Sequence, residues 1–299
     1  MRFLFCILFL FPASFAFPQV AKSVVLDSIT IQAVRQGFDV ADFIEMVKSD
    51  TSFLRGFQNL RNNQHQVAGT VTVYGKKKKV VATRYKKARQ HVENSKSWME
   101  MQDENVTGDF YNRKNEPETY TAELCDEVFF YRDTTEVLPI SQSITGETPA
   151  NNQGNISKLK TLVFNPGAEI EGVPLVGKRM AIFDDEMVKY YDYAIQTKMY
   201  QDSISCYVFS CKAKPDAGDY PVLKNLNTWF DRKTFNVIYR DYQYQYSGVL
   251  FDFDVNIKVT MNYNGEVLYP ANIIYNGYWD IPFHKEEKVN FNLSFNLLQ

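Results

Sequence analysis

Alternating acidic residues near the C-terminus are the chain's best candidates for metal or acid–base chemistry. Asp252, Asp254 and Asn256 place oxygen atoms at the first, third and fifth positions of a calcium-binding loop. Such a loop has Gly at the sixth position and Glu at the twelfth, whereas this chain has Ile257 and Tyr263 there. Two carboxylates about 7 Å apart on one strand face could also serve glycoside hydrolysis. The solvated polar face of a strand explains the pattern better than either site.

The histidines and the known catalytic motifs offer no stronger candidate. His65, His91 and His284 stand apart from one another and from the cysteines, at spacings that suit no metal site. The sequence contains no Gly-x-Ser-x-Gly elbow, no His-Glu-x-x-His pair, no phosphate-cradling glycine loop and no Cys-x-x-Cys pair. We therefore expect no enzyme, no cofactor and no metal.

Three cysteines follow the N-terminal apolar run. Cys206 and Cys211 fall in one predicted strand, where a separation of five residues puts them on opposite faces about 16 Å apart. They cannot pair with each other in an unbroken strand. A disulfide from Cys125 to either of them, or three buried thiols packed as small hydrophobic groups, would both fit the sequence.

A basic cluster is the main local charge feature in a chain whose net charge is -2. That balance gives no reason to expect a nucleic-acid partner. The cluster consists of the predicted turn Lys76 to Lys79, followed by Arg84, Lys86, Lys87 and Arg89. It could dock anionic headgroups or an acidic envelope protein at the membrane periphery. A charged turn that keeps a hairpin soluble is the preferred interpretation.

The segment 251–261 is the strand around which the other elements are organised. Apolar and polar residues alternate strictly there, which is typical of a strand with one apolar and one polar face. The following Asn264-Gly265 pair predicts a tight type I′ hairpin, so the neighbouring strands are antiparallel. An aromatic content of 15% also favours sheet over helix.

The remaining segments predict a mainly antiparallel β, α+β fold. Strands are expected at 66–74, 79–89, 189–199, 203–213, 234–246, 249–261, 266–276 and 288–297, with extended segments near 120–131. Strands of this length twist, so the sheet curves strongly or forms an unclosed barrel. An apolar stripe between residues 38 and 60 predicts two short helices or one kinked helix, broken near residues 49–51. We expect this helix on the concave face.

The N-terminus predicts export of the chain. An uncharged run from Phe3 to Phe11 precedes small residues ending at Ala16, which is typical of a cleaved signal peptide spanning residues 1–16. The mature chain is expected to be periplasmic or secreted, with no transmembrane helix. Residues 17–36 would form a lead-in segment, and residues 37–299 a single curved-sheet domain with a long surface loop at 139–157.

Two segments carry a resemblance to a known group. Trp229 to Val237 and Asp252 to Val255 resemble the strand-turn-strand of the periplasmic lipoprotein-carrier (LolA/LolB-like) superfamily, and the chain is also similar to envelope proteins of Bacteroidetes-type bacteria. The superfamily's members form an unclosed barrel lidded by helices. The resemblance implies that the concave face holds acyl chains.

The predicted function is non-enzymatic binding of a hydrophobic ligand, such as a lipid or a lipoprotein acyl chain, in a curved half-barrel. Ten residues are predicted to form the ligand-binding wall: Phe251, Phe253, Val255, Ile257, Val259, Met261, Phe235, Val237, Phe291 and Phe295. One alternative is an outer-membrane β-barrel, whose strands also have one apolar and one polar face. Another is an envelope structural or interaction module whose groove is filled by its own helix.

Overall fold

The computed structural model describes residues 24–26, 29–31, 40–137, 163–169, 176–249, 252–281 and 285–298. The expected signal peptide, the expected loop at 139–157, Phe251 and His284 lie outside these residues. Nothing in the structure therefore tests the predictions made for them.

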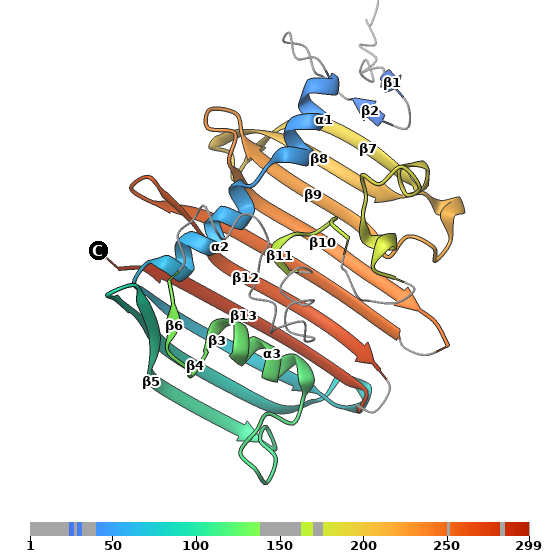
Figure 1. Cartoon of the computed structure of the whole chain (residues 1–299). Helices are drawn as coiled ribbons and strands as arrows, with labels where there is room; N and C mark the ends of the chain where they lie inside the picture. The colour runs from blue at the N-terminus through green and yellow to red at the C-terminus, as the bar shows by residue number, and fades with distance from the viewer. Residues whose placement is uncertain are drawn as a thin grey trace, which may run out of the picture.

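One open, curved sheet of 13 strands extends through the described part of the chain (Figure 1). The strands are β1 (Val24–Leu26), β2 (Ile29–Ile31), β3 (His65–Tyr74), β4 (Val80–Glu93), β5 (Lys96–Gly108), β6 (Thr135–Glu136), β7 (Tyr191–Tyr200), β8 (Ile204–Ala213), β9 (Leu223–Asp231), β10 (Val237–Ser247), β11 (Asp252–Asn264), β12 (Val267–Asp280) and β13 (Glu287–Leu297). Their spatial order is β1-β2-β7-β8-β9-β10-β11-β12-β13-β3-β4-β5-β6. The only parallel pair among them is β2 with β7. The predicted fold class is confirmed, and two short strands occupy the segment expected to be a lead-in.

Strand β11 has the alternation that the sequence predicts. Its inward residues are buried and its outward residues are half-buried or exposed, as a half-solvated antiparallel strand requires. The hairpin to β12 is also present, with Asn264 paired to Val267. Of the two loop residues only Gly265 has a positive φ, 61°, so the expected type I′ turn is wrong. A glycine at the first of two central positions is the arrangement of a type II′ turn.

The three α-helices whose full extent lies in the described residues cover one face of the sheet (Figure 1). They are α1 (Val40–Ser49), α2 (Ser52–Asn62) and α3 (Tyr120–Phe129). The break between α1 and α2 confirms the predicted interruption near residues 49–51. The described part of the chain also contains four 3-10 turns: η1 (Lys76–Lys78), η2 (Lys178–Met180), η3 (Val188–Tyr190) and η4 (Pro215–Ala217). None of the described helices is long and apolar enough to cross a membrane.

Helix α3 contradicts the extended segment expected near residues 120–131. Its buried residues include Thr121, and Leu124, Cys125 and Phe129 follow it by three, four and eight positions, so the four share one helix face. The prediction of an extended segment rested on its many aromatic and apolar residues, which are also typical of strands. Strands β5 and β9 were not predicted as separate elements.

A buried arginine fixes the junction between α1 and α2 on the sheet. The guanidinium of Arg240, on β10, lies 4.3 Å from the ring centre of Phe53, and its Nε donates a 3.0 Å hydrogen bond to Thr228. Its Nη2 is 3.9 Å from a carboxylate oxygen of Asp50. The other Asp50 oxygen accepts the backbone N–H of Ser52, at the start of α2. Burial lowers the pKa of Arg240, and Asp50 opposes that shift.

Replacing Asp50 by Asn should destabilise the protein by about 3 kcal/mol, because the substitution leaves a buried guanidinium without a counter-charge. Adding Arg240→Met should recover part of that loss, since the unpaired charge is then gone. Urea unfolding would measure both. Glu45→Gln removes an exposed ion pair with Lys48 and serves as the control, with an expected loss below about 0.5 kcal/mol. A double variant as unstable as the sum of the two single variants would contradict this account.

Candidate functional site

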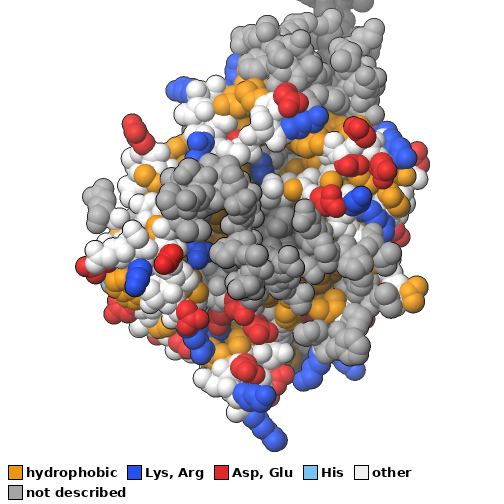
Figure 2. All heavy atoms as spheres, viewed as in Figure 1, with side chains coloured by type: hydrophobic (Ala, Val, Ile, Leu, Met, Phe, Trp, Pro, Cys, Tyr) orange, Lys and Arg blue, Asp and Glu red, His pale blue; other side chains and the backbone are white. Residues whose placement is uncertain are grey.

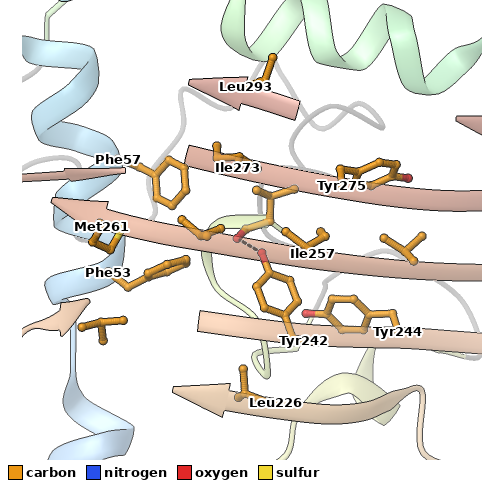
Figure 3. Packing of buried hydrophobic residues seen from close by; sticks show 14 of the residues in the cluster. Phe53, Phe57, Leu226, Tyr242, Tyr244, Ile257, Met261, Ile273, Tyr275 and Leu293 are labelled. Atoms are coloured by element: carbon orange, nitrogen blue, oxygen red, sulfur yellow. Dashed lines mark hydrogen bonds between the residues drawn. The ribbon is translucent and has the colours of Figure 1, made fainter. Parts of the chain in front are cut away.

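The concave face of the sheet brings the predicted wall residues together. Nine of the ten lie in the described part of the chain: Phe253, Val255, Ile257, Val259 and Met261 on β11, Val237 on β10, Phe291 and Phe295 on β13, and Phe235 in the turn before β10. Eight are buried members of one hydrophobic cluster, and Phe235 packs against it half-buried. Figure 3 shows Ile257 and Met261 within this layer, beside Ile273 and Tyr275 of β12. Their contact with a ligand stays a prediction.

Helices α1 and α2 cover part of this wall. The ring of Phe43, on α1, lies edge-on to Phe235 at 5.6 Å between centres. On α2, Phe53 and Phe57 are buried and point into the layer beside Met261 (Figure 3). Gly56 allows this approach, because a Cβ there would lie 2.2 Å from the Met261 Cε atom. In the structure these wall residues are therefore hydrophobic core covered by the protein's own helices.

Helix α3 covers the neighbouring part of the face, and its first turn is attached to β13. The carboxylate of Glu287 is buried and accepts the backbone N–H groups of Tyr120 at 2.8 Å and Thr121 at 2.9 Å. The Thr121 hydroxyl donates to the same carboxylate. A negative charge at a helix N-terminus is favourable because the first N–H groups have no partner within the helix. Glu287 thus positions the start of α3.

A second charged contact holds the middle of α3. The Asp126 carboxylate accepts two hydrogen bonds from the Arg84 guanidinium, of which one measures 2.6 Å, and lies 3.3 Å from the Lys86 ammonium. The side chain of Arg84 is completely buried and also lies 4.6 Å from the ring centre of Phe110. Burial alone would lower the pKa of Arg84, but its hydrogen bonds and attraction to Asp126 raise it. The guanidinium therefore stays charged.

A small, partly enclosed space lies where α3 meets the sheet. It has a volume of about 20 Å³, and its lining is almost wholly apolar. The lining residues are Thr121, Leu124, Cys125, Val128 and Phe129 of α3, Val163 and Phe164, and Tyr275 and Phe291 of the sheet. An apolar space of this size stays dry, so packing against α3 is incomplete here. An acyl chain would fit only if α3 moved outward.

The three cysteines in the described residues, Cys125, Cys206 and Cys211, are free and buried, so neither disulfide considered from the sequence is present. Cys125 faces the space below α3, and burial raises the pKa of its thiol to about 12. Burial also raises the pKa of Cys211. Thiols of this kind react slowly at neutral pH, because only the thiolate is nucleophilic.

The acidic residues considered for chemistry lie on the opposite, outward face of β11. An Asp252 oxygen accepts the backbone N–H of Gly248, and an Asp254 oxygen accepts the side chain of Gln243. Both carboxylates therefore serve the polar face of the sheet. In the part of the chain that the structure describes, no group of three or more His, Cys, Asp or Glu residues could hold a metal ion.

Sequence reasoning missed the charged residues that hold the helices. Arg84 and Lys86 were read as part of a solvated basic cluster, yet both occupy inward positions of β4. The available signal was their spacing, because Arg84 and Lys86 are in step with Ala82 and Ala88 on one face of the strand. Asp126 fell in a segment expected to be extended, and Glu287 has no local pattern that marks it as a helix partner.

Comparisons with known proteins give only a distant likeness. No family model matches the chain, and no curated protein matches its sequence. A solved DUF1329 family protein from Desulfovibrio piger is 10% identical, with a TM-score of 0.25, over 85% of this chain and 88% of that one. A putative outer membrane lipoprotein-sorting protein domain from Vibrio parahaemolyticus is 6% identical, with a TM-score of 0.28, over 86% and 91%. Structural similarity with TM-scores this low, at 10% identity or less, assigns no function to the chain.

Proposed function

We propose that the chain is an exported, non-enzymatic binding protein that holds a hydrophobic ligand between its concave face and its helices. The observation that carries the proposal is the apolar space between α3 and the sheet. Displacing α3 would join this space to the buried wall on β13 and β11. The ligand class is a lipid or acyl chain, because the surface offers apolar burial worth about 25 cal/mol per Å² and few polar groups.

The leader-like N-terminal sequence supports export to the periplasm or the exterior. In such a compartment an acyl chain needs shielding from water, which a covered apolar face supplies. The covering helices α1 to α3 are short, each of 10 or 11 residues. Short helices depend on tertiary packing for their stability, so a ligand that replaces that packing can displace them.

The alternative is an envelope interaction module whose helices fill the groove permanently. Its supporting observation is the complete burial of the wall, with Val255, Ile257 and Val259 each at 0% exposure. The two functions differ in whether the apolar face ever binds a lipid or acyl chain in place of the protein's own helices.

Palmitate, added to the detergent-free protein and followed by native mass spectrometry, should form a one-to-one complex. Val128→Trp, at a half-buried position lining the space, should fill it and weaken binding about tenfold, the effect of losing about 1.4 kcal/mol of apolar contact. Val188→Trp, at a half-buried position on η3, is the matched control and should leave the affinity unchanged. No palmitate uptake by the wild-type protein would favour the interaction module.

Loosening the start of α3 should expose Cys125 to modification. Glu287→Gln removes the charge at the helix N-terminus, and iodoacetamide should then label Cys125 about tenfold faster. Labelling of Cys211, in the same molecule, should not change. Glu286→Gln, the exposed neighbour, is the matched control. If Cys125 labelling accelerates while palmitate association keeps its rate, the ligand enters elsewhere.

A further inference from the structure

Strand β5 leaves most of one backbone edge without a partner among the described residues. Its other edge pairs with β4 along its length, whereas β6 pairs only with Lys96 and Ser97. The side chains from Glu100 to Gly108 are all exposed. An edge of this length presents unpaired N–H and C=O groups, to which an extended segment of another chain can add as a further strand.

A groove of about 530 Å³ lies along α3, between the segments that adjoin the two ends of β5, and no residue of β5 itself lines it. Thr135, which pairs with Ser97 at the start of β5, contributes to its lining. Asn115, Glu116 and Pro117 contribute from the segment that follows the end of β5. The remaining lining includes α3, so the groove is bounded by elements from both ends of β5 and by the helix above the sheet.

The groove is acidic. Its charged lining consists of Glu116, Glu123, Asp126, Glu127 and Asp133, with Arg61 and Arg132 as the cations. Figure 2 shows acidic side chains gathered over the lower part of this face, where α3 and the segment after β5 lie in Figure 1. Glu123 and Asp133 are exposed. Asp126 is already paired with Arg84 and Lys86, so the attraction on a cationic side chain that enters the groove comes from the other carboxylates of the lining.

Strand β4 already shows what kind of strand pairs with β5. Across that antiparallel pair Arg89 lies opposite Glu100, Lys87 opposite Asp103 and Lys86 opposite Glu104. Opposite charges at facing positions stabilise a strand pair, and like charges destabilise it. A second copy of β5 would bring the same three acidic residues close to their own counterparts. The charge pattern therefore disfavours self-association and favours a basic partner strand.

We infer that the open edge of β5 binds an extended, basic segment of a partner protein. The segment adds as a strand along residues 98–108 and directs lysine or arginine side chains into the acidic groove. The groove and the apolar space below α3 share the side chain of Val128 and lie on either side of the same helix, so the peptide test is made without added lipid.

The test uses the peptide acetyl-(Lys-Val)5-amide, with acetyl-(Glu-Val)5-amide as its charge-reversed control. Fluorescence anisotropy should show binding of the lysine peptide only, weakening as salt rises. Hydrogen exchange measured by mass spectrometry should show new protection of backbone amides within residues 98–108. Glu123→Gln with Asp133→Asn should weaken binding about threefold to tenfold.

The matched control is Asp185→Asn with Asp216→Asn, which removes the same charge from exposed positions outside the groove and should leave the affinity unchanged. Equal weakening by both double variants would overturn the site, since only overall charge would then matter. Binding without protection of residues 98–108 would overturn strand addition. A dimer of the protein that protects the same amides and excludes the peptide would show that a second copy is the true occupant.

Discussion

The apolar concave face of the sheet is the constraint on which the other features depend. Eight of the described wall residues belong to one buried cluster, and that cluster needs a cover to stay out of water. Apolar packing alone is not directional, so it does not decide where a short helix sits. Buried charged contacts supply that direction, because a carboxylate and a guanidinium must meet in a defined geometry.

Each part of the helical cover has such a contact. Asp50 meets Arg240 where α1 ends and α2 begins, Asp126 meets Arg84 in the middle of α3, and Glu287 meets the first turn of α3. All three join a helix to a strand that is distant in sequence. A buried ion pair adds little net stability compared with apolar packing, so its value here lies in the position it gives each helix. We regard these contacts as the reason that three separate helices cover one sheet in one arrangement.

The fold was largely predictable because its strands are long and half-solvated. From Asp252 to Met261 in β11 every second residue is buried, so a simple alternation identifies the strand and its inward face. The same reasoning wrongly predicted an extended segment where α3 lies, because the apolar residues there suit a strand as well as a helix. They are Leu124, Cys125, Phe129 and Phe130. The role of Glu287 could not be predicted, since it depends on a residue 166 positions away in the chain.

The basic cluster illustrates how a strand's neighbours decide the role of its charges. Lys76 to Lys78 form an exposed turn, as a soluble hairpin requires. Farther along β4 the inward Arg84 and Lys86 hold α3, while Lys87 and Arg89 face the acidic residues of β5. The acidic residues on β5 therefore act on both sides of the strand. Toward β4 they stabilise the pair. Along the edge that has no partner among the described residues, the same charges would repel a second copy of β5.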